Sequence, residues 1–446
     1  MAELKVGFPE RFLWGTATAA FQVEGNNTKC DWSQFEQQPG AIWHSDHSGL
    51  ACDWWRNAEQ DFDLMADMGH NTHRLSVEWS RIEPEEGVFD PSAIGRYREM
   101  LAGLRSRGME PMVTLFHFST PLWLARQGGW SNPAVTGYFR RFARHAVEQL
   151  GDLVTLWCTI NEPNIYAALG YALGEHAPGK KSLPLYFRVL SNLLQAHAAA
   201  YRAIHAVQGD AQVGLVKNVQ IFEPLDPADK ASAALANLLD YVFNEVTLRA
   251  VVDGRLRFPL GSGLRIHGSL VDSVDFWGVN YYQRQRVSLK VRTGLRGVLQ
   301  PTPGAPVSDF GRNGTYGEIY PAGIYRVLDK IRRFRKPIYV TENGLPDDDD
   351  DQRPGFLLAH LAQVQRAISA GADVRGYYHW SFTDNFEWAE GWGLRFGLVA
   401  LDPETQTRTP RPSAQLFSEL AGANAITRDM VAAYAPELLA EIFSNA

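Results

Sequence analysis

The sequence has few cysteines, and the three that it has are not spaced as metal ligands. Cys30, Cys52 and Cys158 are scattered and show no Cys-x-x-Cys motif. An odd, dispersed set of this kind is typical of buried free thiols in a reducing compartment, and it argues against a fold held together by disulfides.

Long hydrophobic runs and clusters of positive charge are also missing. The longest uncharged apolar stretch, Val113–Ala125, is too short to cross a bilayer, and Met1–Val6 has no apolar signal region. The net charge is -7 at pH 7 and no basic run stands out, which argues against a nucleic-acid partner. We therefore expect a cytoplasmic protein that binds neither membranes nor nucleic acid.

The rest of the composition is that of an ordinary globular protein with many aromatic residues. Hydrophobic residues make up 45% of the 446 residues and charged residues 21%. A chain of this length buries enough surface to form a core without disulfides or metal. Several of the 13 tryptophans stand beside polar residues, a pattern that favours a site that grips sugar rings.

Strand-like and helical segments alternate along the chain, and no low-complexity linker divides it. Eight segments have the composition of strands: 12–22, 72–79, 109–117, 153–160, 212–217, 274–282, 337–341 and 374–380. Helical periodicity occupies the stretches around them, for example 58–68, 138–150, 185–207, 231–251, 322–334 and 356–370. Eight such alternations favour a closed parallel barrel, so we predict an α/β fold with a single (β/α)8 TIM barrel domain over residues 1–446.

Two of the expected strands end in a glutamate that stands beside an asparagine. Val340-Thr341-Glu342-Asn343-Gly344 closes the seventh strand, and Thr159-Ile160-Asn161-Glu162-Pro163 closes the fourth. The carboxyl ends of barrel strands meet at one face, where ligands bind. A lone glutamate there is more often part of a structural ion pair, but two carboxylates across one pocket are what glycoside cleavage requires. The pair therefore predicts a glycosidase.

Every other expected strand except the fifth also ends near side chains that hydrogen-bond or stack. These side chains are Gln22, Arg74, His117, Asn280, Tyr282, Trp380, Glu387 and Trp388. Taken singly, His117 is more often a core histidine and Trp380 more often a packing residue. Together they indicate a binding site at the carboxyl face.

In these motifs the sequence resembles glycoside hydrolase family one, the retaining β-glucosidases and β-galactosidases. The resemblance runs from Phe12-Leu13-Trp14-Gly15-Thr16-Ala17 to about Pro412. Its most specific part is the pair Thr-Ile-Asn-Glu-Pro and Val-Thr-Glu-Asn-Gly, in this order and about 180 residues apart. It implies a barrel with the acid/base after strand four and the nucleophile after strand seven.

The resemblance implies a role for each residue at the site. Glu342 is expected to attack the anomeric carbon, while Glu162 protonates the leaving oxygen and later deprotonates water. This chemistry requires carboxyl groups about 5–5.5 Å apart and gives net retention. Arg74, Tyr282 and Asn280 are expected to support the two glutamates. The sugar is expected to contact Gln22, His117, Asn161, Tyr282, Glu387, Trp388 and, as a stacking floor, Trp380.

We therefore expect a β-glucosidase that releases terminal glucose from O-glycosides and oligosaccharides such as cellobiose, without a cofactor. Glu162 argues against the thioglycosidases, which carry glutamine there, and Glu387 would repel a 6-phosphorylated sugar. Phe118 replaces the tryptophan of many relatives and takes away an indole donor. Two alternatives stay open: a broad glucosidase, galactosidase and fucosidase that acts largely by transglycosylation, and a non-catalytic sugar-binding barrel.

Two stretches that suggest metal ligands are interpreted as structural. Asp347–Asp351 lacks alternating ligand spacing and a glycine bend, so we expect a solvated loop that leads into the next helix. His44-Ser45-Asp46-His47 is not accompanied by a further pair of ligands. No metal site is therefore expected, and the sequence does not indicate an oligomeric state.

Overall fold

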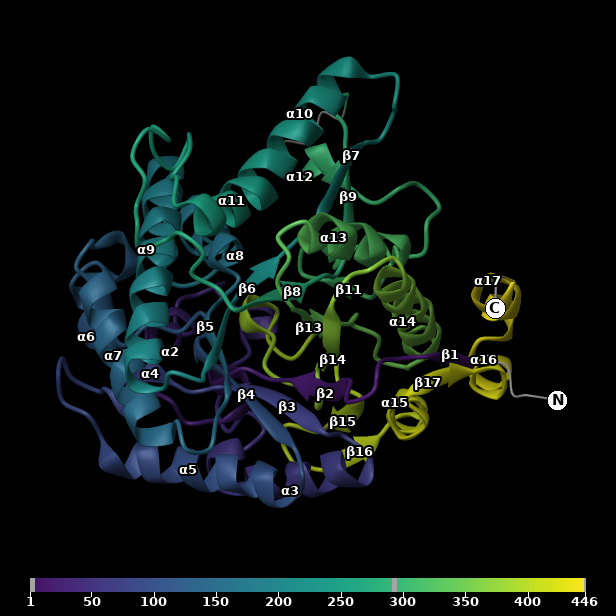
Figure 1. Ribbon diagram of the computed structural model, residues 1–446, viewed down its shortest axis with the longest axis horizontal. Helices are drawn as coiled ribbons and strands as arrows, with labels where there is room; N and C mark the ends of the chain where they lie inside the picture. The colour runs from purple at the N-terminus through teal and green to yellow at the C-terminus, as the bar shows by residue number, and fades with distance from the viewer. Residues whose placement is uncertain (1–4, 291–294, 445–446) are drawn as a thin grey trace.

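The computed structural model describes residues 5–290 and 295–444 and has a closed barrel of eight parallel strands at its centre (Figure 1). The predicted (β/α)8 barrel is confirmed. In order around the barrel, the strands are β2 (Leu13–Ala17), β3 (Thr72–Ser76), β4 (Glu110–Phe116), β5 (Leu156–Asn161), β6 (Gln212–Asn218), β8 (Phe276–Asn280), β13 (Ile338–Asn343) and β14 (Val374–Trp380).

A helical segment follows each barrel strand along the chain. These segments are α3 (Trp54–Asp67), α5 (Pro91–Ser106), α7 (Val135–Leu150), α9 (Leu183–Val207), α10 (Lys230–Asp240) with α11 (Val246–Asp253), α13 (Ala322–Arg332), α14 (Arg353–Ser369) and α15 (Pro412–Ala423). A π-helical turn, Tyr241–Glu245, joins α10 to α11.

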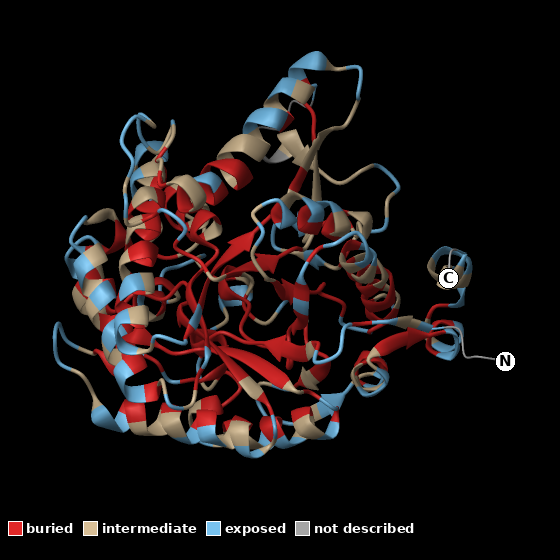
Figure 2. Cartoon of the chain, in the orientation of Figure 1, coloured by how far each residue is buried: buried red, intermediate tan, exposed pale blue. Residues whose placement is uncertain are grey.

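Helix α7 illustrates how the sequence specifies this outer layer. Its buried residues include Phe139, Phe142, Ala143, Ala146 and Val147, a spacing of three and four that forms one apolar stripe. The strands inside have no such alternation, because the barrel interior covers one face and the helices cover the other. β3, β5, β8 and β13 are accordingly buried along their whole length (Figure 2).

The first two predicted strands are too long. β2 ends at Ala17, and the chain then forms a helical turn, α1 (Ala20–Val23), so Gln22 lies on a helix and not at a strand end. β3 ends at Ser76, and the Glu78 side chain accepts a hydrogen bond from the N–H of Ser80 at the start of α4 (Trp79–Ile82). The apolar run continues through both turns, so hydrophobic pattern alone did not reveal where the strands stop.

Most of the tryptophans serve the core. Seven have less than 2% of their surface exposed: Trp14, Trp32, Trp54, Trp79, Trp130, Trp157 and Trp277. The large apolar surfaces of these seven fill the layer between strands and helices. Two others, Trp380 and Trp388, line the pocket described below.

The acidic run after β13 is not the fully solvated loop that the sequence suggested. Asp347 and Asp350 are buried, whereas Asp348, Asp349 and Asp351 are exposed. Asp347 accepts hydrogen bonds from the N–H groups of Gln352 and Arg353, at the start of α14. The loop does lead into the helix, but through buried contacts.

Two additions lie outside the barrel. A small sheet of β7 (Ile221–Pro224), β9 (Arg284–Val287) and β10 (Leu299–Gln300) stands beside α10. Near the two ends of the chain, β1 (Lys5–Gly7) pairs with β17 (Ala425–Thr427), which lie together at one side of Figure 1. None of the helices in the described ranges has the length and apolar character that a membrane crossing needs.

Candidate active site

The carboxyl ends of the barrel strands surround a pocket that contains both predicted catalytic glutamates. The lining residues are His117, Phe118, Asn161, Glu162, Ile165, Leu169, His176, Tyr282, Tyr316, Glu342, Trp380, Glu387 and Trp388. They come from the ends of β4, β5, β8, β13 and β14 and from the loops that follow. The strand-end residues of distant segments are thus brought together, as predicted.

Glu342, near the end of β13, is held by two donors. Its Oε1 accepts a hydrogen bond from Nη1 of Arg74 at 2.5 Å, and its Oε2 accepts one from the hydroxyl of Tyr282 at 2.7 Å. Arg74 is completely buried on β3, and Glu342 is 3% exposed. The two donors hold this carboxyl group in one position, and the guanidinium places a positive charge directly beside it.

Glu162 stands in different surroundings. Its Oε1 accepts hydrogen bonds from Nδ2 of Asn218 and Nδ2 of Asn280, each at 2.8 Å, but no positive side chain forms an ion pair with it among the described residues. Burial, and then the charge of Glu342, raise its pKa to about 7. The two carboxyl groups therefore have unlike surroundings, because an arginine pairs with one and two amides hold the other.

A chain of hydrogen bonds connects the two glutamates below the pocket floor. Arg74 donates from Nη2 to Oδ1 of Asn161 at 2.7 Å, and Asn280 donates to the same oxygen at 3.3 Å. Asn161 in turn donates from Nδ2 to Nε2 of His117 at 3.0 Å. The network fixes the side chains of both carboxyl groups relative to one another.

The predicted sugar-binding residues lie on the pocket wall or directly behind it. His117, Asn161, Tyr282, Trp380, Glu387 and Trp388 line the pocket. Gln22, Arg74 and Asn280 lie one layer deeper, where each donates a hydrogen bond to a lining carboxylate: Glu387, Glu342 and Glu162, respectively. Three of the lining residues, Phe118, Glu162 and Trp388, have positive φ angles of 71°, 42° and 52°. Such left-handed backbone in non-glycine residues is concentrated at functional sites.

Asn218 is the main contact that the sequence analysis missed. The fifth strand was expected to stop at 217 and was the one strand thought to lack a polar end. β6 instead extends to Asn218, whose register partner on β8 is Asn280. The asparagine directly after the predicted strand was the sequence signal that could have identified this contact. Tyr316 and His176, which also line the pocket, come from loops that carry no such signal.

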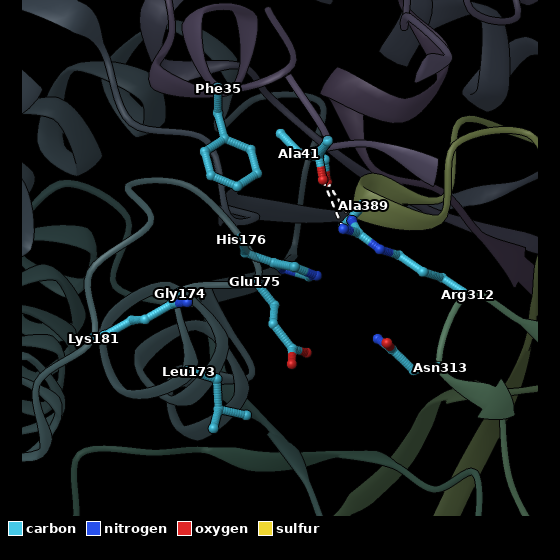
Figure 3. A pocket seen from close by; sticks show the side chains of 11 residues that line it. Phe35, Ala41, Leu173, Gly174, Glu175, His176, Lys181, Arg312, Asn313 and Ala389 are labelled. Carbon is cyan, nitrogen blue, oxygen red and sulfur yellow. Dashed lines mark hydrogen bonds between the residues drawn. The ribbon is translucent and has the colours of Figure 1, made fainter. Parts of the chain in front are cut away.

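An outer pocket adjoins the sugar pocket through His176 and has a volume of about 380 Å³. In Figure 3, Glu175 and His176 point into the space between Phe35 and Leu173, and Arg312 and Asn313 lie on the opposite side. Arg312 donates hydrogen bonds to the backbone oxygens of Gly40 and Ala41. The segments 173–181 and 312–313 thus supply much of this wall.

Comparisons with known proteins agree with this geometry. The model of the family described as glycosyl hydrolase family 1 matches residues 4–426. The chain belongs to glycosyl hydrolase family 1. Members of this family hydrolyse O-glycosides with retention, so this family 1 enzyme works through a covalent glycosyl-enzyme. The alternative of a non-catalytic sugar-binding barrel is therefore set aside.

Relatives of this family 1 enzyme cover nearly its whole length. It is 32% identical to beta-glucosidase A of Thermotoga maritima, over 94% of this chain and 98% of the relative. It is 33% identical to a beta-galactosidase of Saccharolobus solfataricus, over 95% of this chain and 96% of the relative. Among solved structures, a beta-glycosidase from Pyrococcus horikoshii has a TM-score of 0.87 at 38% identity, with 97% and 98% of the two chains covered.

Proposed function

We propose that this enzyme is a β-glucosidase in which Glu342 is the nucleophile and Glu162 the acid/base. It would release terminal non-reducing β-D-glucosyl residues from O-glycosides and oligosaccharides such as cellobiose. The observation that carries the proposal is the unequal environment of two carboxyl groups in one pocket. One is paired with a buried arginine, and the other has a pKa raised to about 7.

In the first step, Glu342 attacks the anomeric carbon as a carboxylate. Its two donors, Arg74 and Tyr282, hold it in place but leave its charge available for the covalent bond. Glu162, whose pKa of about 7 keeps a large share of the acid form at neutral pH, delivers its proton to the departing oxygen. The bond to the sugar forms at Glu342 as the bond to the leaving group breaks.

In the second step, Glu162 acts as a base. Once Glu342 is esterified, its negative charge is gone, and this charge is the second-largest cause of the raised pKa of Glu162. The pKa of Glu162 then falls, and the carboxylate takes a proton from the water that attacks the glycosyl-enzyme. Asn218 and Asn280 stabilise this charged form by donating to it.

A sugar is the ligand that best fits the remaining polar atoms. Oε1 of Gln22 and Nδ1 of His117 are buried and have no hydrogen-bond partner among the described residues. Hydroxyl groups of a bound sugar would satisfy such atoms, and Trp380 offers an aromatic face beneath the ring. Glucose is preferred in this proposal because of the likeness to a beta-glucosidase, with galactose as the second sugar to test.

The two roles are tested by replacing each glutamate with alanine and adding sodium azide. With Glu342→Ala, azide attacks from the side that the nucleophile vacated, so the expected product is an α-glucosyl azide. With Glu162→Ala and a nitrophenyl glucoside, the glycosyl-enzyme still forms, and azide then gives a β-glucosyl azide. The assignment is wrong if the two products are exchanged, or if Glu342→Gln hydrolyses the glucoside as well as the parent enzyme does.

Two finer points belong to the same proposal. Product analysis at high cellobiose concentration separates hydrolysis from transglycosylation, because transfer gives trisaccharides and hydrolysis gives glucose alone. A cytoplasmic location is supported by the three cysteines, which are all buried and unpaired. Cell fractionation tests it.

A further inference from the structure

The acidic run after β13 is divided into two sets by its contacts. Asp350 forms an ion pair with Arg353 and accepts hydrogen bonds from the N–H and hydroxyl of Ser413. Asp348 lies 3.7 Å from Arg411. These two carboxylates, at alternate positions, are turned toward arginines.

The other three carboxylates converge on one another. One oxygen each of Asp347, Asp349 and Asp351 lies within 4.8 Å of the others. The ion pairs of this loop are made instead by Asp350 with Arg353 and by Asp348 with Arg411. Asp309 adds further negative charge, since it accepts a hydrogen bond from the N–H of Asp348 at 2.9 Å. Carboxylates at this separation repel one another.

Asp347 supplies a second, separate observation. Its side chain is completely buried, and its Oδ2 accepts from the N–H of Gln352 and Arg353 at 3.0 and 2.7 Å. Its Oδ1 is also buried but has no hydrogen-bond partner within the described residues. A buried carboxylate oxygen without a partner is costly, so this atom points to a ligand that the protein itself does not provide.

We propose that Asp347, Asp349 and Asp351 form a binding site for a divalent cation, and that Ca²⁺ is the ion that fits it. Calcium binds oxygen ligands at about 2.3–2.6 Å, so two ligands on opposite sides of one ion are about 4.8 Å apart. The three oxygens satisfy this limit. Because Asp349 and Asp351 are exposed, water completes the six to eight ligands that calcium takes.

This proposal revises the expectation drawn from the sequence. A run of five acids does contain alternate ligand positions, here 347, 349 and 351, although the uniform sequence conceals them. The site lies in the loop between β13, which carries Glu342, and α14. An ion there binds the folded chain and not the unfolded one, so it raises the thermal midpoint.

The test is calorimetric titration of the EDTA-treated full chain with CaCl₂, together with thermal melts with and without the ion. We expect one ion per chain and a thermal midpoint that rises with CaCl₂ and returns with EDTA. Asp349→Asn and Asp351→Asn should each weaken binding at least tenfold. Both residues are exposed, so these variants are preferable to Asp347→Asn, which would disturb the start of α14.

Asp348→Asn is the matched control, because it removes the same charge from the same loop but lies outside the converging set. It should bind Ca²⁺ as the parent chain does. The site is refuted if the parent chain shows neither heat nor a midpoint shift up to millimolar CaCl₂, or if Asp348→Asn loses as much affinity as the other two. Binding is measured without substrate, so neither outcome bears on the glycosidase assignment.

Discussion

At the scale of single residues, the chemistry depends on what each glutamate touches and not on the glutamates alone. Glu342 contacts a guanidinium and a phenol, and Glu162 contacts two amides. Amide donors favour a carboxylate less strongly than a paired arginine does, and burial works against it. This difference is the reason why the proposed mechanism makes Glu342 the nucleophile and Glu162 the acid.

We predict that the upper arm of the pH profile of kcat/KM lies near pH 7 and moves to higher pH in Asn218→Ala. Removing the donor destabilises the Glu162 carboxylate, so its pKa rises further. The base form is then harder to reach, and kcat should fall roughly 10- to 100-fold, since a hydrogen bond to a charged group contributes about 1.5–3 kcal/mol. The measurement is kcat and kcat/KM on nitrophenyl glucoside between pH 4 and 9.

Asn192→Ala provides the control for this variant. Asn192 is also buried and donates one hydrogen bond, to the backbone oxygen of Trp130, but it lies on α9 away from the pocket. Its loss should reduce stability and leave the pH profile in place. An upper arm that stays at the parent position in Asn218→Ala would contradict the role given to Asn218.

The meeting of the two glutamates in one pocket was predictable from the sequence, because each follows a short buried strand, a local signal that survives without the fold. Asn218 was missed because the end of its strand was placed one residue early. His176 and Tyr316 were not accessible at all, since loop residues reach the pocket through the path of the chain and not through any pattern around them. Residues marked by a local pattern, such as those at strand ends, could therefore be predicted. Residues that only the tertiary structure brings to the pocket could not.

At the scale of the elements, the carboxyl ends of β13 and β14 approach each other closely beside Glu342. Asn343 on β13 is the register partner of His379 on β14. A Cβ on the following residue, Gly344, would lie 1.9 Å from the backbone oxygen of Trp380. Glycine is required here so that the strand carrying Glu342 can pass the strand carrying Trp380.

We predict that Gly344→Ala lowers both stability and kcat. The added methyl group overlaps a backbone atom that no side-chain movement can clear, so the two strand ends must separate, at a cost of about 1–3 kcal/mol. A shift of the nucleophile by about 1 Å is enough to reduce kcat by roughly 100-fold. Urea unfolding and steady-state rates measure the two effects.

Gly422→Ala is the corresponding control within helix α15. A Cβ there meets nothing within 4 Å, so this change should be neutral or raise stability slightly, with unchanged kcat. The account of the β13–β14 contact fails if Gly344→Ala keeps the parental kcat.

At the scale of the whole molecule, burying so many polar side chains makes stability depend on pH in both directions. Burial lowers the pKa of His70, His176 and His360 to about 3 and that of His197 to about 4. It raises the pKa of Asp31, Glu78 and Glu162 to about 7 and that of Glu387 to about 8. In the unfolded chain these histidines titrate near 6.5 and the carboxyls near 4.

The signs of the two effects are opposite. Below pH 6.5 the histidines bind protons in the unfolded chain but not in the folded protein. The free energy of unfolding therefore falls as the solution becomes more acidic. Between about pH 4 and 8 the folded carboxyls hold protons that the unfolded chain releases, so the free energy of unfolding falls as the pH rises. Both effects operate between about pH 4 and 6.5. Above pH 6.5 only the buried carboxyls still change the free energy of unfolding with pH. Stability should therefore be greatest where the two effects balance, between about pH 5 and 6.

We predict that His360→Gln flattens the acid arm of this curve. His360 is fully buried on α14, with Nδ1 against the backbone oxygen of Phe356, so its replacement removes one group that binds a proton only on unfolding. The slope of the unfolding free energy against pH is proportional to the number of protons that the chain binds on unfolding. Between pH 4 and 6 this number should fall by up to one in the variant, even if the variant is less stable at every pH. His44→Gln, at an exposed position, should leave the slope unchanged. Equal slopes for His360→Gln and the parent would mean that His360 is protonated in the folded protein. The packing around α14 would then accommodate a buried positive charge.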